Sequence, residues 1–358
     1  MKEHDMDISG VNLQNIQIDI PIVVVPLPNV QTWTSVNGVD GAGILYDGSQ
    51  YVVASKDISA SFAGDVRTSA NGASWTTQAS VQGGNPVLLS KIGNRYYLGA
   101  NRYSTDLVTW SNASVSGLTA PYTLYQAVSN GTAYMTVGYT TATPTELYVL
   151  TSANGTSWTV DATSNIQAGV RYFNGLAAAN GGNFVLAGRY DLSTSGSNVT
   201  VYTNNVNTGW GNSKITYTLS GANMQVSGGS TAGTGVNYVN GEFVIFWANT
   251  DTINSRLTST TGNTWTSTAI NSTDFVQGGV VTDLKHNGTY YLATGYSLDP
   301  SNNQYSVCIS TDLNTWSNLN VPVGVGISSI TYAAAMAPGG NRVVVPSYSR
   351  IRYGNLQL

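Results

Sequence analysis

The chain has 358 residues, a formal net charge of −4 at pH 7 and only 9% charged residues, whereas about 25% is usual in soluble domains. Its lysines and arginines form no cluster, which excludes nucleic-acid binding because phosphate neutralisation requires grouped cations. Two histidines and one cysteine are too few for a zinc site, a histidine-based catalytic triad or an intrachain disulfide, so we expect no metal and no cofactor.

Residues 1–30 differ from the rest of the chain. Their acidic start lacks the basic region and long apolar core of a signal peptide. The apolar, β-branched segment that follows is too short and too interrupted by proline for a membrane helix, and it should be extended. It must pack either on its own domain or on another chain, and docking on a partner by strand addition is slightly favoured. The docking residues are then Ile18, Ile20, Ile22, Val23, Val24, Val25 and Leu27.

Residues 31–358 contain a repeat marked by tryptophan. Seven of the eight tryptophans recur at intervals of about 35 to 55 residues, the length of a four-stranded propeller blade. Most of them end a polar phrase, such as Ser69 to Trp75, that joins two strands. The Asp or Asn of the phrase is placed to bond amides of its own turn, and the indole should fill the gap between neighbouring blades. We therefore interpret the phrase as structural.

A second repeat is a tight turn, such as Asn240-Gly241 or Asn287-Gly288, followed by an apolar run, and it also occurs seven times. Asn-Gly flanked by β-branched and aromatic residues predicts a hairpin, and a continuous apolar run indicates a strand buried on both faces. Each unit then has strand A before this turn, strand B after it, strand C leading into the polar phrase and strand D from the tryptophan. The last unit, from about residue 328 to 354, ends before strand D, which residues 31–36 can supply.

These repeats predict one all-β domain over residues 31–358. We expect a seven-bladed β-propeller of four-stranded antiparallel blades, closed by an N-terminal strand that completes the last blade. Residues 1–30 form an extended N-terminal docking arm outside it.

The tryptophan phrases resemble the Asp-box, or bacterial neuraminidase repeat, of propeller proteins, whose pattern is Ser-x-Asp-x-Gly-x-x-Trp. Asp106 and Asp312 keep the acid without the glycine, whereas Asn71 and Asn154 keep the glycine without the acid. The resemblance covers nearly all of the chain beyond the arm and implies a propeller. The residues assigned to this structural motif are Asn71, Trp75, Asp106, Trp110, Asn154, Trp158, Trp265, Asp312 and Trp316.

Asp-box proteins include sialidases, but the sequence argues against that activity. The resemblance to a sialidase would require an early Arg-Ile-Pro, which is absent. It would also require a nucleophilic tyrosine with a partner glutamate, and the only glutamates of the chain are Glu3, Glu146 and Glu242. Glycosidases more generally need two carboxylates within about 5 to 10 Å. Because the acids here are few and mostly isolated, we expect no enzymatic activity.

A ligand should bind on the face formed by the B–C and D–A loops, which vary most in length. Arginines and aromatic residues gather in two such loops of one predicted blade, where aromatic faces with polar neighbours suit a sugar ring. The alternative is that these tyrosines only pack the loops or the next blade. The candidate ligand-binding residues are Arg171, Tyr172, Phe173, Arg189, Tyr190 and Asp191.

The predicted function is that of a non-enzymatic structural or adhesive component of a phage particle, in a tail, fibre or head appendage. Low charge, richness in Gly, Ser, Thr and Asn, a single cysteine and an extended arm resemble the virion appendage proteins of tailed bacteriophages, which are assembled in the host cytoplasm. The arm would bind other virion proteins, and the propeller would contact a protein or a host surface glycan. A homo-oligomer is compatible with this arrangement, and membrane insertion is not expected. The alternative is a sialidase-like or a secreted carbohydrate-binding propeller.

Overall fold

The structure is a computed structural model. It describes residues 27–38, 41–55, 64–83, 88–118, 122–140, 147–161, 172–189, 198–204, 214–218, 236–248, 253–270, 279–297, 305–322, 333–347 and 350–357. The secondary-structure elements in these ranges are all β-strands. None of the described residues belongs to a helix that is long and apolar enough to cross a membrane.

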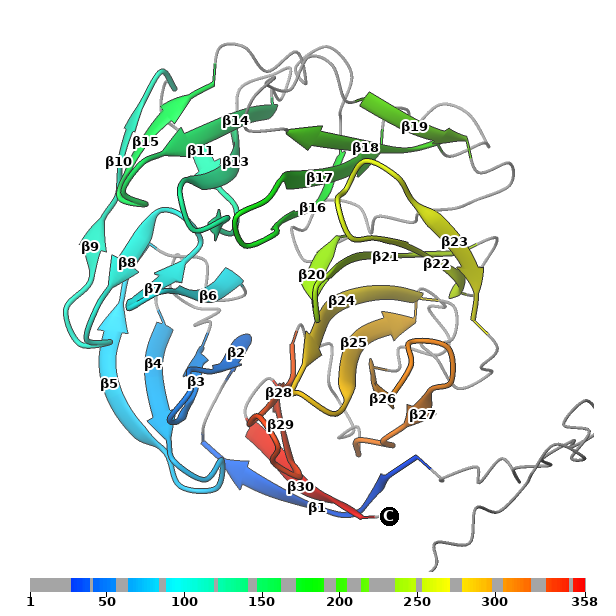
Figure 1. Cartoon of the computed structure of the whole chain (residues 1–358). Helices are drawn as coiled ribbons and strands as arrows, with labels where there is room; N and C mark the ends of the chain where they lie inside the picture. Colours follow the sequence, from blue (N-terminus) through cyan, green and yellow to red (C-terminus); the bar gives the residue numbers. More distant parts are fainter. Residues whose placement is uncertain are drawn as a thin grey trace, which may run out of the picture.

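Six four-stranded antiparallel sheets of the described residues form blades around a ring (Figure 1). Strand A of each blade is innermost (Figure 1), and between neighbouring blades β2 contacts β6 and β28, while β20 contacts β16 and β24, without pairing. The first blade contains β2 (Gly43–Tyr46), β3 (Tyr51–Ala54), β4 (Gly64–Ser69) and β5 (Thr76–Val81). The second contains β6 (Leu89–Ile92), β7 (Arg95–Leu98), β8 (Arg102–Ser104) and β9 (Ser111–Asn112).

The next three blades follow the same order from the centre to the rim. The third blade contains β16 (Tyr172–Ala178), β17 (Phe184–Arg189), β18 (Asn198–Asn204) and β19 (Lys214–Thr218). The fourth contains β20 (Asn237–Val239), β21 (Glu242–Ala248), β22 (Ile253–Ser259) and β23 (Thr266–Ala269). The fifth contains β24 (Gly279–His286), β25 (Tyr291–Ser297), β26 (Tyr305–Ser310) and β27 (Ser317–Asn318).

The closing blade joins the two ends of the chain, as the sequence predicts. It contains β28 (Ala335–Met336), β29 (Arg342–Ser347), β30 (Arg350–Gln357) and, as its outermost strand, β1 (Asn29–Asn37). β1 pairs antiparallel with β30 from Asn29 opposite Gln357 to Asn37 opposite Arg350, and Figure 1 shows the first strand beside the last. The Nε1–H of Trp33 also donates to the carbonyl of Leu319 at 3.1 Å, which ties β1 to the fifth blade.

The remaining sheet corrects the expectation of seven four-stranded blades, because among the described residues it has six strands and one parallel pair. It lies in the ring between the second and third blades (Figure 1). Its strands are β10 (Ser114–Ser116), β11 (Tyr122–Leu124), β12 (Val128–Ser129), β13 (Tyr134–Thr140), β14 (Leu147–Ser152) and β15 (Ser157–Val160).

Two local departures produce this six-stranded sheet. β11 and β12 both pair with β13, so the expected strand A is interrupted between Leu124 and Val128. The expected strand D of the second blade pairs with β8 only at Ser111 and Asn112, and from Ser114 the chain instead pairs in parallel with the outer edge of β15. The added strand satisfies backbone groups of an edge that would otherwise face water.

The core lies between neighbouring sheets. The hydrophobic clusters each combine two adjacent sheets, as where Tyr51 and Val53 of the first blade meet Val344 and Ile351 of the closing blade. In β3, Val52 and Val53 point to opposite faces and are both 0% exposed. The continuous apolar runs of the sequence therefore form strands that are covered on both faces.

Candidate functional site at the centre of the ring

The structure brings two of the predicted ligand-binding residues together. Tyr172 begins β16 and lies opposite Arg189, the last residue of β17, and Phe173 lies opposite Gly188. Arg171, Tyr190 and Asp191 lie outside the described residues. The strand register thus places Tyr172 and Arg189 side by side at one end of the third blade.

The predicted docking arm precedes the closing strand directly. Leu27 is half-buried and is followed by Pro28 and β1, whereas Ile18, Ile20, Ile22, Val23, Val24 and Val25 lie outside the described residues. Because β1 is the outermost strand of its blade, its first residue, Asn29, lies at the outer edge of the ring.

The tryptophan phrases form one recurrent hydrogen-bonded turn. In the second blade, Oδ1 of Asp106 accepts from the backbone N–H groups of Val108 at 2.9 Å and Thr109 at 2.7 Å. The Ser104 hydroxyl donates to the same oxygen at 2.9 Å and accepts from the N–H of Leu107. These bonds, the one from Thr109 first, hold the pKa of Asp106 at about 2.

Copies with asparagine make the same turn without a charge. Oδ1 of Asn71 accepts from the N–H groups of Ala73 at 2.9 Å and Ser74 at 3.0 Å. Asn154 holds the N–H groups of Thr156 and Ser157, each at 2.9 Å. The turn needs an oxygen acceptor at this position, which aspartate and asparagine both supply.

The indoles lie between neighbouring sheets. Trp75 packs on the core shared with the closing blade, and Trp110 packs on the core shared with the first blade. Most Nε1–H groups cap a carbonyl of their own turn, as in Trp75 to Gly72 at 3.1 Å and Trp316 to Leu313 at 3.0 Å. Trp158 instead donates to Ala100 of the second blade at 3.1 Å. Trp265 is 8% exposed and bonds the carbonyl of Gly262.

Side chains of the A–B turns link adjacent blades, which the sequence did not indicate. Oδ2 of Asp47 accepts from the Tyr96 hydroxyl of the second blade at 2.6 Å. The amide of Asn240 donates to the Tyr291 hydroxyl of the fifth blade at 2.9 Å. The Asp47 and Asn240 positions are equivalent, so the blade-to-blade link is repeated with the donor and acceptor exchanged.

Burial and hydrogen bonding act in opposite directions on Asp47. Desolvation raises its pKa, but the hydrogen bond from Tyr96 and the backbone N–H groups of Gln50 and Ser49 outweigh it and lower the value to about 2. The pKa of Tyr96 is raised above its usual value by burial and by this carboxylate. The turn is therefore held by an ionised acceptor and a neutral phenol.

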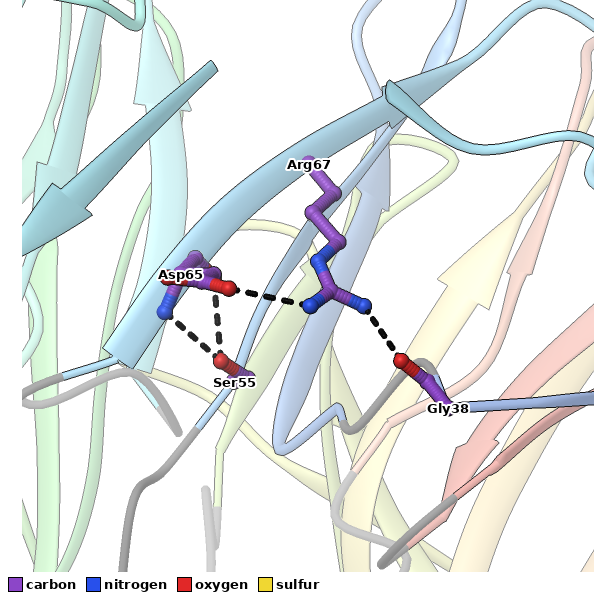
Figure 2. Close-up of polar contacts among 4 residues, drawn as sticks. All are labelled: Gly38, Ser55, Asp65 and Arg67. Carbon is purple, nitrogen blue, oxygen red and sulfur yellow. Dashed lines mark hydrogen bonds and ion pairs between the residues drawn. The ribbon is translucent and has the colours of Figure 1, made fainter. Parts of the chain in front are cut away.

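A polar cluster lies at the B–C end of the first blade, the end opposite its A–B turn (Figure 2). The guanidinium of Arg67 forms an ion pair with Asp65 at 2.9 Å and donates to the carbonyl of Gly38, just after β1, at 2.8 Å. The Ser55 hydroxyl accepts from the N–H of Asp65 at 2.7 Å. Arg67 thus joins the first blade to the end of the closing strand, and Asp65 holds its guanidinium in place.

The charged side chains of the described ranges do not assemble a metal site. No group of three His, Cys, Asp or Glu residues there could hold a metal ion. The carboxylates of Asp65 and Asp283 are paired with Arg67 and Lys285, and those of Asp47, Asp106 and Asp312 accept hydrogen bonds in turns.

A cavity of about 390 Å³ opens on the inner side of four consecutive blades. It lies where strands β2, β20, β24 and β28 run into their A–B turns, on the face opposite the one predicted to bind a ligand. Its volume is in the range of small-molecule sites, about 300 to 1,000 Å³. It is lined by Leu45, Tyr46, Tyr238, Val239, Asn240, Leu284, Lys285, His286, Asn287, Leu292, Ala335, Met336 and Pro338.

Lys285 links the innermost strands of neighbouring blades beside this cavity. Its ammonium group donates to the carbonyl of Ile44 in the first blade at 2.9 Å and to that of Ala334 next to β28 at 3.0 Å. It also pairs with the carboxylate of Asp283, two residues earlier on the same face of β24, at 2.5 Å. One side chain therefore joins three consecutive blades, and its charge is neutralised.

Three rings on the cavity wall are held by aromatic partners in their own blades. Tyr46 packs edge-on against Tyr51 with ring centroids 5.1 Å apart, and Tyr238 packs on Phe243 at 4.8 Å. His286 packs on Tyr291 at 4.4 Å. These residues are not among the predicted ligand-binding residues. Two of them could have been identified from the sequence, because each is an aromatic residue directly before the A–B turn, in Tyr46-Asp47 and His286-Asn287.

The architecture places the chain in the class of β-propellers. No family model matches it, and no curated protein matches it. Similar solved structures include a puromycin hydrolase mutant complexed with PGG, at 9% identity and a TM-score of 0.48, over 87% of this chain and 59% of that one. This chain therefore spans about three fifths of that hydrolase.

Two other similar structures match the chain over most of both lengths. A gluconolactonase from Xanthomonas campestris matches at 10% identity and a TM-score of 0.43, over 93% of this chain and 95% of that one. The fucose-recognising, six-bladed lectin of Aleuria aurantia matches at 13% identity and a TM-score of 0.41, over 89% of each chain. At these identities the similarity shows the propeller fold alone.

Proposed function

We propose that the chain is a non-enzymatic structural and adhesive module of a phage particle, anchored through its N-terminal arm, with the propeller displayed for contact with a protein or a glycan. The observation that carries this proposal is the position of β1. It forms the rim of the closing blade, so the arm can engage a partner at the edge of the disc without opening the ring.

The chemistry of the described residues supports binding rather than catalysis. The carboxylates of Asp65 and Asp283 are neutralised by cations 2.9 and 2.5 Å away, and Asp106 is held at a low pKa within a turn. A glycosidase instead needs one carboxyl with a raised pKa beside an ionised one. The 9% charged residues and a surface of neutral polar groups agree with a displayed disc that is assembled on a particle.

Deletion of residues 2–26 tests the anchor, because it removes the arm and leaves β1 intact. We expect the shortened propeller to keep its thermal unfolding temperature and to be lost from purified particles, as measured by immunodetection across a density gradient. Full incorporation of the shortened chain would refute the anchoring role. Turnover of any glycoside by the complete chain would refute the non-enzymatic role.

A second candidate function is that of a secreted carbohydrate-binding propeller. The specific observation in its favour is the cavity at the A–B turns, which is lined by aromatic and amide groups. Sugar binding without any association with particles would favour this candidate over the particle component.

A further inference from the structure

The cavity on the inner side of the ring is an open recess between four blades. The innermost strands of four blades supply its walls, and Lys285 lines it and donates from β24 to the carbonyls of Ile44 and Ala334. These bonds and the ion pair with Asp283 occupy the three N–H donors of the ammonium group. The charge of Lys285 is therefore balanced before any ligand enters.

The surroundings of His286 favour the uncharged form of its imidazole. Burial lowers its pKa, and its Nδ1 accepts a hydrogen bond from the N–H of Gly288 at 3.3 Å, which requires an unprotonated Nδ1. Because Lys285 is paired and His286 is neutral, the cavity has no net charge to attract an anion or a cation.

The wall presents flat rings next to polar groups. Tyr46, Tyr238 and His286 are half-buried, and each is fixed by an aromatic partner one strand further out. Asn240 is exposed at the edge of the cavity, where its side-chain amide donates a hydrogen bond to the Tyr291 hydroxyl. Rings that are already ordered lose little conformational entropy when a ligand packs on them.

We propose that this cavity binds a neutral sugar ring, with Tyr238 and His286 stacked on its C–H faces and the amide of Asn240 bonding its hydroxyl groups. A pyranose has apolar faces and a polar edge without charge, which matches the rings, amides and balanced charge of the wall. The inference rests on the adhesive part of the proposed function and not on the arm. It places the ligand on the A–B face, opposite Tyr172 and Arg189.

The test measures how methyl glycosides of neutral hexoses bind to the complete chain. Binding is measured by calorimetry and by ligand-observed NMR. We expect saturable binding of at least one glycoside, weakened at least about tenfold in Tyr238→Ala and little changed in Tyr238→Phe, which keeps the ring. Arg189→Ala is the control on the opposite face and should bind as the wild type. His286→Ala gives an independent test if Tyr238→Ala unfolds at a lower temperature.

The inference is overturned if no neutral glycoside binds at about 10 mM, a concentration that detects weak sites. It is also overturned if Arg189→Ala loses binding while both cavity variants keep it, or if sialic acid binds more tightly than every neutral sugar. The chain without residues 2–26 should bind the sugar as the complete chain does. Loss of sugar binding and loss of anchoring are therefore separate results.

Discussion

At the scale of single residues, the tryptophan phrase depends on the acceptor at its third position. Asp106 and Asn71 accept from two following turn amides at similar distances, within 2.7 to 3.0 Å. The turn of the tryptophan phrase therefore forms with either aspartate or asparagine at this position.

Asp106→Asn should preserve the turn, whereas Asp106→Ala should lower the unfolding temperature at every pH because two amides lose their acceptor. The folded-state pKa of about 2 is below the ordinary 3.8, so the charge of Asp106 stabilises the fold above pH 3.8, and this contribution is lost as the pH falls toward 2. The difference in unfolding temperature between wild type and Asp106→Asn should shrink over that range in thermal scans. A constant difference would contradict the role of the charge.

The fourth position of the phrase has a positive φ and is occupied either by glycine or by leucine. Gly72 has a φ of +73°, and a Cβ there would lie 2.6 Å from Cγ2 of Val344 in the closing blade. Leu107 takes a similar φ of +65° and is 3% exposed between the first two blades. The strain of a leucine in this conformation, about 1–2 kcal/mol, is offset by burying its side chain.

Gly72→Ala should destabilise the propeller by about 2–4 kcal/mol, because left-handed strain and a clash with the fully buried Val344 add together. The matched control is Gly38→Ala, where φ is +74° and nothing lies within 4 Å of the added Cβ. In chemical denaturation, the free energy of unfolding of this control should fall only by the cost of the strain, about 1–2 kcal/mol. Equal losses at the two sites would show that the blade contact adds nothing.

At the scale of elements, the A–B turns and strand β24 hold the blades to one another at the centre. Lys285 reaches a carbonyl 241 residues away in sequence, and Asp47 accepts from Tyr96 of the next blade. The turns that form each hairpin therefore also join neighbouring hairpins.

Lys285→Met should lower the free energy of unfolding by about 2–4 kcal/mol, since it leaves the Asp283 carboxylate and two carbonyls without their donor. Lys91→Met is the control, because Lys91 also donates to a carbonyl of another blade, that of Asp47, but is exposed. Its cost should stay below about 1 kcal/mol in the same denaturation experiment. A loss at Lys91 as large as at Lys285 would contradict a special role for the centre.

At the scale of the whole molecule, β1 closes the ring from the outside. Val30 is 9% exposed and packs with Leu356 and Val343 in the core of the closing blade. Removing β1 would expose this core and the outer edge of β30.

Deletion of residues 2–37 should lower the unfolding temperature and cause concentration-dependent association, because an uncovered edge pairs with other chains. Deletion of residues 2–26, which retains β1, should do neither. Thermal scans and light scattering at several concentrations would measure both. A monomeric, equally stable chain without β1 would show that closure is not needed.

Much of the fold followed from local signals. Asn-Gly turns before apolar runs predicted strands A and B, and the incomplete last unit predicted that an N-terminal strand closes the ring. The count of seven four-stranded blades was wrong. The strand after Trp110 leaves its own blade at Ser114 to pair with β15, a choice that depends on a free edge formed more than 40 residues later.

The candidate site was much less predictable. Tyr172 and Arg189 do lie side by side, but the cavity is on the other face, and its lining residues come from four blades that are far apart in the sequence. Tyr46, Tyr238 and His286 are each ordinary strand residues in their own hairpins. They come together only because the blades are arranged in a circle.

The sequence by itself determined the repeating turns, the alternation of strands and the exchange of a strand between the two ends, because these depend on backbone preferences and burial patterns within one unit. Only the tertiary structure decided the contacts between units: the departure of β10, the bond from Lys285 to Ile44 and the uncharged cavity. Those contacts join residues up to hundreds of positions apart, and their geometry is set by how each blade packs on the next.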